Sequence, residues 1–300
     1  MRTYLPGRRV NGEIEALEWS GALNRFRSAN LYISRFSKGT EMVISISTAA
    51  VPAMLLAGAL AAGPAAGAAF LFSTGDPDGR IATGARPSTT GKIEIESADD
   101  FILGQTTSIN HATFTGLLPA GVSLSDIGNV HLEIYRVFPK DSQNPPSGNV
   151  PTRVNSPSDV AFQEREVASS NLSFVASILN GSFSAANSVL NGINKIPNQT
   201  TGGEGPVTGQ EVLFDVSLLT PFFLPADHYF FIPQVELSSG DFLWLSAAKP
   251  ITGGTGAFDP DLQSWIRNED LAPDWLRIGT DIVGAAAGGA APTFNAAFSL

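Results

Sequence analysis

Carboxylates that lie close together are the residues with the clearest chemical potential in this sequence. Asp76 and Asp78 stand in the run GDPDG, and Asp99 and Asp100 are adjacent in SADDF. Carboxylate oxygens are hard ligands of the kind that calcium prefers, so the four residues predict a Ca²⁺ site if their strands pair. The competing interpretation is a plain β-turn, because Asp, Pro and Gly are typical turn residues.

Two tryptophans in a polar, acid-rich segment suggest a second kind of site. A flat indole can stack on the apolar face of a sugar ring while charged neighbours bond its hydroxyl groups. The competing interpretation buries both indoles beneath a long loop, and Trp244 in FLWLS is expected in the core. The residues of the predicted carbohydrate site are Trp265, Trp275, Asp261, Arg267, Asp274 and Arg277.

Histidine offers a third possibility. His131 and Glu133 share one face of an expected strand, and His228 follows Asp227. Two histidines and a carboxylate would suit a transition metal if their strands were neighbours. The spacing matches no established zinc motif, and a solvated strand face is the competing interpretation.

Motifs for hydrolytic chemistry are absent from the sequence. There is no G-x-S-x-G nucleophile elbow and no phosphate-binding G-x-x-x-x-G-K-[ST] loop. A glycosidase needs only two carboxylates at a suitable separation, which a sequence does not reveal. Enzymatic activity therefore stays open, and a non-catalytic role is favoured.

Composition narrows the class of protein further. The 300 residues are 43% hydrophobic and 15% charged, which indicates a folded chain rather than a disordered one. The formal net charge of −10 argues against binding nucleic acid, which requires clustered Lys and Arg. Because the chain has no cysteine, disulfides, thiolate zinc sites and a cysteine nucleophile are excluded.

The elements that would position these residues are short strands. Apolar and polar residues alternate in runs separated by loops rich in Gly and Pro, which is typical of half-buried strands. Ile93 and Ile95 are expected to face the core, with Glu94 and Glu96 opposite. The expected strands are 92–97, 130–138, 172–178, 211–218, 228–237, 242–246 and 293–300.

Helical structure is expected only as short turns, near 125–127, 185–190 and 262–268. The pattern predicts an all-β fold, a single antiparallel two-sheet β-sandwich of jelly-roll or immunoglobulin-like type. It would span residues 70–300, preceded by a signal peptide.

The first 69 residues have a different character. Arg35 and Lys38 precede an apolar run over 42–62, which the small-residue segment GPAAGAA follows. This order predicts a secretory signal peptide within a leader over 1–69. The competing interpretation is a membrane anchor, because the run is near the lower length limit for a spanning helix.

Several segments are similar to one known family. They are FSTGDPDGRIAT, IESADDFIL, VHLEIYRVFPKDS, LPADHYFFIPQVEL, GDFLWLSA, LQSWIRNEDLAPDWLRIGTDIVG and FNAAFSL. The chain resembles an uncharacterised family of exported bacterial β-sandwich proteins related to PEP-CTERM-sorted proteins. The resemblance implies an association with the cell envelope, a biofilm or an extracellular matrix, without a catalytic mechanism. The C-terminal sorting tail does not follow Leu300 in this sequence, so simple secretion is expected.

Together these observations predict a secreted bacterial protein, extracellular or periplasmic, with a structural or adhesive role. Its expected partners are extracellular polysaccharide or further copies of itself, with Ca²⁺ as the one expected cofactor. No nucleic acid and no stable membrane anchor after cleavage are expected. The alternatives are a carbohydrate-binding module that uses Trp265 and Trp275, and a secreted glycan hydrolase.

Overall fold

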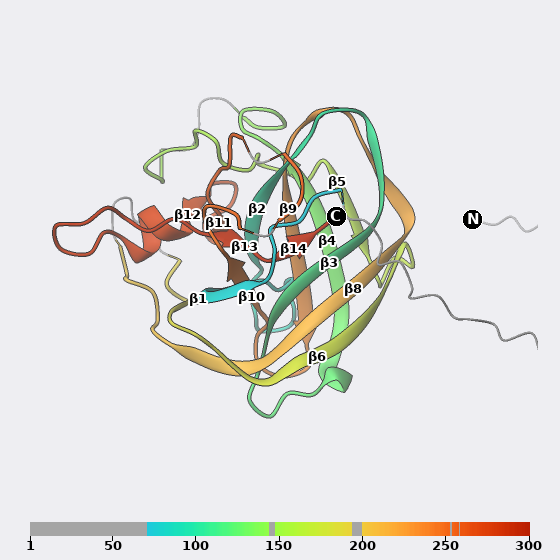
Figure 1. Cartoon of the computed structure of the whole chain (residues 1–300), viewed down its shortest axis with the longest axis horizontal. Helices are drawn as coiled ribbons and strands as arrows, with labels where there is room; N and C mark the ends of the chain where they lie inside the picture. Colours follow the sequence, from blue (N-terminus) through green and yellow to red (C-terminus); the bar gives the residue numbers. More distant parts are fainter. Residues whose placement is uncertain (1–70, 144–147, 194–199, 253, 258) are drawn as a thin grey trace, which may run out of the picture. The chain divides into compact units, whose positions relative to one another are not determined.

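A computed structural model describes residues 71–143, 148–193, 200–252, 254–257 and 259–300 (Figure 1). About half of these residues form strands, and nearly all of the regular structure is β, as the alternating pattern predicted. The elements are β1 (Pro77–Gly84), β2 (Ile95–Leu103), β3 (Thr107–Pro119), η1 (Leu124–Asp126), β4 (Ile127–Arg136), β5 (Gln163–Glu166), β6 (Leu172–Ala185), β7 (Ser188–Val189), β8 (Val207–Leu224), β9 (Asp227–Leu237), β10 (Leu243–Ala247), β11 (Trp265–Asn268), β12 (Leu276–Arg277), η2 (Ile278–Val283), β13 (Asn295–Ala296) and β14 (Phe298–Ser299).

The strands build two sheets, in which antiparallel pairing dominates. The eight-stranded sheet has the order β6-β8-β3-β10-β1-β7, with β13 paired to β10 and β14 paired to β3. The six-stranded sheet has the order β12-β11-β2-β9-β4-β5. Successive strands from β1 to β4 alternate between the two sheets, as do β8, β9 and β10. The predicted all-β fold with two antiparallel sheets is therefore confirmed.

The main core lies between the sheets, and aromatic rings supply much of it. Phe114 and Phe214 stack with their ring centroids 4.7 Å apart, on neighbouring strands of the eight-stranded sheet. Phe231 from the six-stranded sheet stacks on Phe298 at 5.1 Å, and Trp244 meets the same ring edge-on at 5.9 Å. Burial of such large rings is the dominant stabilising term in a sandwich of this size. Trp244 is in the core, as predicted.

The outer face of the six-stranded sheet differs from the predicted pattern of polar, solvated residues. On β4, Val130, Leu132 and Ile134 face the core as expected, but Glu133 and Tyr135 on the opposite face are buried too. The expectation for the strand at 92–97 was wrong in part, because Ile93 is exposed whereas Glu96 is buried. A strand that is covered on both sides shows no simple alternation.

Two of the three expected helical turns were wrong. The turn near 125–127 is confirmed as η1, whose Ser123 backbone N–H donates to Asp126 Oδ2 at 2.7 Å. Residues 185–190 instead contain β7, and residues 262–268 contain β11. In both places pairing with an existing sheet edge supplies the backbone hydrogen bonds that a local helix would otherwise make.

The predicted leader over 1–69, including the apolar run, lies outside the described residues. Among the residues that the structure does describe, no helix is long and apolar enough to cross a membrane.

Candidate functional site

The outer face of the six-stranded sheet carries the densest group of ionisable side chains. We call it the covered face, defined by Glu96, Glu133, Tyr135, Arg267 and Trp275. They come from β2, β4 and β11 and from the segment just before β12. All of them are buried, with Trp275 completely inaccessible to solvent.

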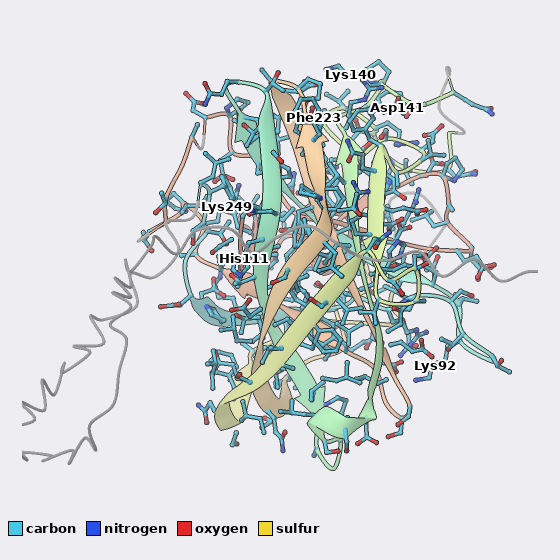
Figure 2. All side chains as sticks on the ribbon, turned by 90° about the vertical axis from the view of Figure 1, so that its right-hand side faces the viewer. Lys92, His111, Lys140, Asp141, Phe223 and Lys249 are labelled. Carbon is cyan, nitrogen blue, oxygen red and sulfur yellow. The ribbon has the colours of Figure 1, made fainter. Side chains whose placement is uncertain are left out.

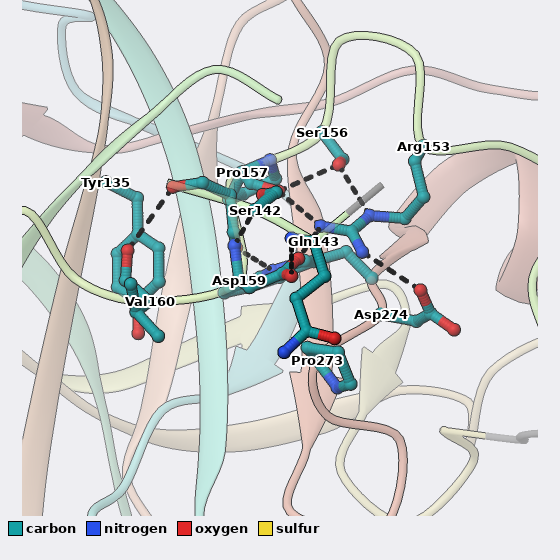
Figure 3. A network of polar contacts seen from close by, with 12 residues as sticks. Tyr135, Ser142, Gln143, Arg153, Ser156, Pro157, Asp159, Val160, Pro273 and Asp274 are labelled. Carbon is teal, nitrogen blue, oxygen red and sulfur yellow. Dashed lines mark hydrogen bonds and ion pairs between the residues drawn. The ribbon is translucent and has the colours of Figure 1, made fainter. Parts of the chain in front are cut away.

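Described residues between β4 and β5 cover part of this face, where Arg153, Asp159 and Asp274 form one polar network (Figure 3). Arg153 holds the loop in place, because its guanidinium pairs with Asp274 at 2.9 Å and with Asp159 at 3.0 Å. Trp275 Nε1 donates to the carbonyl oxygen of Ser158 at 3.0 Å. Residues 153–159 are therefore held against the covered face by side-chain and backbone contacts.

Arg267 is the cation at the centre of the covered face. Its guanidinium forms a bidentate ion pair with the Glu96 carboxylate and lies over the Trp275 ring, 4.3 Å from the centroid. Tyr135 donates its hydroxyl to Glu96 Oε1 at 2.9 Å and accepts from Arg267 Nη2 at 2.8 Å. Such a pair needs several matched hydrogen bonds to offset the loss of hydration, and here both partners have them.

Glu133 has a different environment from Glu96. Burial, followed by the neighbouring carboxylates of Glu96 and Glu94, raises the pKa of Glu133 well above its usual value. Burial and Glu96 also raise the pKa of Glu94. Glu96, by contrast, is paired with Arg267, so the two carboxyl groups of the covered face have opposite electrostatic environments.

A hollow of about 460 Å³ opens beside these groups. Glu133, Tyr135 and Arg267 line it from the sheet, with Phe162 and Glu164 on its rim. Glu164 lies directly opposite Glu133 on β5, which brings a third carboxylate to the same place. The site therefore combines buried and accessible carboxylates around one space that a small molecule or ion can enter.

The four aspartates of the predicted calcium site do not come together. Asp99 faces the core and accepts hydrogen bonds from Ser264 Oγ at 2.9 Å and Ala296 N at 2.8 Å. Asp100 points to the opposite face, where it pairs with His228 at 2.6 Å. Successive strand residues point to opposite sides of a sheet, so these two carboxylates cannot share an ion. The prediction of a joint calcium site was wrong.

Asp78, in the segment GDPDG, is held by hydrogen bonds from within the protein. Asp78 Oδ1 accepts hydrogen bonds from Ser246 Oγ at 2.5 Å and from the backbone N–H of Arg80 at 3.0 Å. Asp76 and Asp78 line a hollow of about 550 Å³. The plain-turn interpretation holds only in part, because Asp78 lies within β1, where the pairing with β10 is irregular between Pro77 and Ala82.

The prediction that the indole rings of Trp265 and Trp275 stack on a sugar was wrong. Trp265 and Trp275 are 1% and 0% exposed, so neither indole has a free face for a sugar ring. They pack with Tyr135, Phe230 and Ile232 in a small apolar cluster on the covered face. The competing interpretation, burial beneath a long loop, is confirmed.

The charged residues of the predicted carbohydrate site separate into two groups. Arg267 and Asp274 are buried in the ion pairs of the covered face. Asp261 and Arg277, by contrast, line a hollow of about 410 Å³ together with one side of Trp265. Trp265 Nε1 is buried there without a hydrogen-bond partner among the described residues.

Sequence reasoning found His131 and Glu133 but missed their neighbour Glu164. The predicted third ligand, His228, instead bonds Asp100, and Asp227 pairs with Lys140 at 2.5 Å. The only available signal was the polar run QERE at 163–166, which forms a short strand beside VHLEIY. Nothing in the sequence specifies that pairing in advance.

Comparison with known proteins leaves these residues as the basis for any functional conclusion. No family model, no curated protein and no solved structure matches the chain.

Proposed function

We propose that this protein is an exported, non-catalytic component of the cell surface or extracellular matrix, and that it assembles through one edge of its eight-stranded sheet. The observation that carries the proposal is strand β6. It is 14 residues long, ends the eight-stranded sheet, and contains no charged residue and no proline. Long edge strands without such residues are a template for pairing with another chain.

The other sheet edges show how unusual β6 is within this molecule. The strands that end the sheets elsewhere in the described residues are β7, β12 and β5, which have two, two and four residues. Most of β6 is exposed, and Val175 has 65% of its surface accessible. Short strands protect an edge from pairing, and β6 lacks that protection.

The occupant that we propose for this edge is β6 of a second copy. The chain carries a net charge of −10, so two copies repel each other across most of their surfaces. The uncharged β6 edge avoids that repulsion. Its regular part over 172–178 pairs with β8 without a bulge, so its outer side offers an even row of backbone groups. Two such edges can pair antiparallel about a two-fold axis, which gives an isologous contact.

The topology favours the jelly-roll form over the immunoglobulin-like one. The orders β1-β10-β3-β8 and β2-β9-β4-β5 are those of eight strands wound as one long antiparallel ribbon folded into two sheets. Strand β6 extends the first sheet beyond this set, as an antiparallel partner of β8. In this interpretation the proposed contact surface is an addition to the basic fold.

The self-association proposal is tested by the mass of the full chain in solution over a range of concentrations. We expect a reversible dimer in the micromolar range for the wild type, and a monomer for Val175→Lys, because a lysine on an edge strand blocks pairing. Val154→Lys is the matched control, since Val154 is 70% exposed and lies in a loop. A wild type that stays monomeric at about 100 µM, or a Val175→Lys variant that still dimerises, would overturn the proposal.

Export is tested separately. We expect a bacterial host to secrete the full chain and to remove the leader after Ala68 or Ala69, because the small-residue segment there suits signal peptidase. N-terminal sequencing of the exported protein measures the cleavage point. A chain that keeps residues 42–62 and stays with the membrane would contradict export as a free protein.

A second candidate function is glycan binding at the 410 Å³ hollow. Asp261 and Arg277 line it, and their side chains offer the acceptors and donors that sugar hydroxyls need. We expect saturable binding to one class of immobilised polysaccharide that Arg277→Gln weakens at least about tenfold, since its guanidinium would contact the ligand directly. No binding across bacterial and plant polysaccharides removes this candidate and leaves the assembly proposal unaffected.

A further inference from the structure

Three side chains with metal-ligating atoms converge beside the covered face. His131 and Glu133 lie two residues apart on β4, and Glu164 lies on β5 opposite Glu133. One ligand atom from each residue falls within 4.8 Å of the other two. The distance from His131 Nε2 to Glu164 Oε2 is 3.6 Å. No other group of three or more such residues converges in the part of the chain that the structure describes.

Glu133 provides an independent sign that this place binds a cation. The residue is only 6% exposed, and its Oε2 atom is buried without a hydrogen-bond partner. Buried acceptors in folded proteins nearly always have a partner, so each exception requires an explanation. A metal ion between the three side chains would supply the missing partner.

The orientation of His131 supports the same conclusion. Its Nδ1 atom is 3.0 Å from Oε1 of Gln234, which is itself fully buried. Gln234 Nε2 donates to Glu94 Oε1 at 2.9 Å, which turns the amide oxygen toward the histidine. His131 therefore donates its Nδ1–H and directs the lone pair of Nε2 toward Glu164. Metal-ligating histidines are characteristically fixed in this way through their second nitrogen.

We propose that His131, Glu133 and Glu164 form a binding site for a divalent transition-metal ion of the Zn²⁺ class. One imidazole nitrogen with two carboxylate oxygens suits Zn²⁺ and its neighbours, whereas Ca²⁺ takes six to eight oxygen ligands. Glu133 and Glu164 also line the 460 Å³ hollow, so the ion would be reachable from solvent. Three protein ligands leave a coordination position for water or for an oxygen atom of a ligand.

The site does not depend on the proposed assembly. The three ligands come from β4 and β5 in the six-stranded sheet, whereas the assembly contact is β6 in the eight-stranded sheet. Metal binding is therefore expected in the monomeric Val175→Lys variant as well as in the wild type.

The test is calorimetric titration of the tag-free, EDTA-treated full chain with ZnCl₂ and, separately, with CaCl₂. We expect one Zn²⁺ per chain and no comparable Ca²⁺ binding. His131→Gln and Glu164→Gln should each weaken Zn²⁺ binding at least about tenfold, because each removes one ligand of three. His111→Gln is the matched control, since His111 also lies 2.7 Å from a carboxylate, that of Asp215, but belongs to no three-ligand group.

Glu164→Gln removes one metal ligand without disturbing the fold. The Glu164 side chain is 67% exposed, so its replacement leaves the fold intact. Absence of saturable Zn²⁺ binding at about 1 mM would overturn the proposal. Wild-type affinity in Glu164→Gln, or tighter binding of Ca²⁺ than of Zn²⁺, would overturn it equally.

Discussion

Charged side chains are buried on the outer face of one sheet and exposed to solvent on the outer face of the other. On the covered face, Arg267 and Glu96 are withdrawn from water and bound to each other beneath a loop. The outer surface of the eight-stranded sheet, which we call the open face, carries His111 on β3 (Figure 2). Val175 on β6 and Asp215 on β8 are paired neighbours in the same sheet. There the His111–Asp215 pair is in contact with solvent, and Val175 is exposed.

This difference indicates which kind of partner each face can bind. Buried ion pairs have lost their hydration and contribute through exact mutual geometry, so little can change around them. Exposed groups contribute little to stability and are free to meet another surface. The covered face therefore suits a small ligand or ion that enters its hollow, and the open face suits a macromolecule that approaches the edge.

The strongest challenge to this comparison is the removal of the central cation of the covered face. Arg267→Met leaves the Glu96 carboxylate buried without its partner, and Glu133 lies close by. We expect a loss of about 3–5 kcal/mol in the free energy of unfolding, which urea denaturation measures. A loss below about 1 kcal/mol would show that the covered face is hydrated in solution and that the contrast is overstated.

A smaller effect is expected from Asp99, which lies in the core between the two faces. Burial, followed by the neighbouring Asp100, raises the pKa of Asp99 well above 3.8, despite hydrogen bonds from Ala296 and Ser264. The folded state therefore holds the proton more tightly than the unfolded state. This group stabilises fully below pH 3.8, and the contribution is lost as the pH rises toward the folded pKa. Asparagine does not ionise, so Asp99→Asn should not lose stability in this way as the pH rises. The variant should therefore gain stability relative to wild type between pH 4 and pH 7.

Asp126 provides the control of opposite sign for this pH series. Hydrogen bonds from the backbone and side chain of Ser123 lower the pKa of Asp126. Its contribution is present above pH 3.8 and is lost as the pH falls through the folded pKa. Asp126→Asn should therefore lose stability relative to wild type at neutral pH and approach it in acid. Parallel pH profiles for the two variants would contradict the assignment.

The smallest effect is expected on the open face. Asp215→Asn removes the carboxylate that lies 2.7 Å from His111 Nε2, at a site where the Asp215 side chain is 54% exposed. We expect a change of less than about 1 kcal/mol in the free energy of unfolding, because solvent screens such pairs. The same urea titration measures it, and a loss comparable to that of Arg267→Met would erase the difference between the faces.

The all-β class and most strand positions could be predicted from the sequence, because alternation reports directly on a strand with one buried face. The strand at 130–138 is an example, since Val130, Leu132 and Ile134 do face the core. The prediction for 92–97 failed because a second layer covers the outer side of β2. Alternation carries no information about a loop from elsewhere in the chain that buries Glu96.

The sites were harder to predict, because they depend on pairing between distant segments. His131 and Glu133 were recognised from their spacing, yet their third neighbour, Glu164, is set by the register of β4 against β5. Trp265 and Trp275 were recognised as unusual, but their burial depends on Ser158 and the loop that carries it.

The way in which the last strands complete the core bears on when the chain can fold. Phe298 on β14 stacks against Phe72 and Phe231, which lie more than 60 residues away in sequence, and Leu71 N donates to the carbonyl oxygen of Leu300 at 2.7 Å. The core stays incomplete until these final residues have arrived. Contacts between residues so far apart in sequence form late, because a long loop must close first, and they place the protein among the slow-folding sandwich proteins.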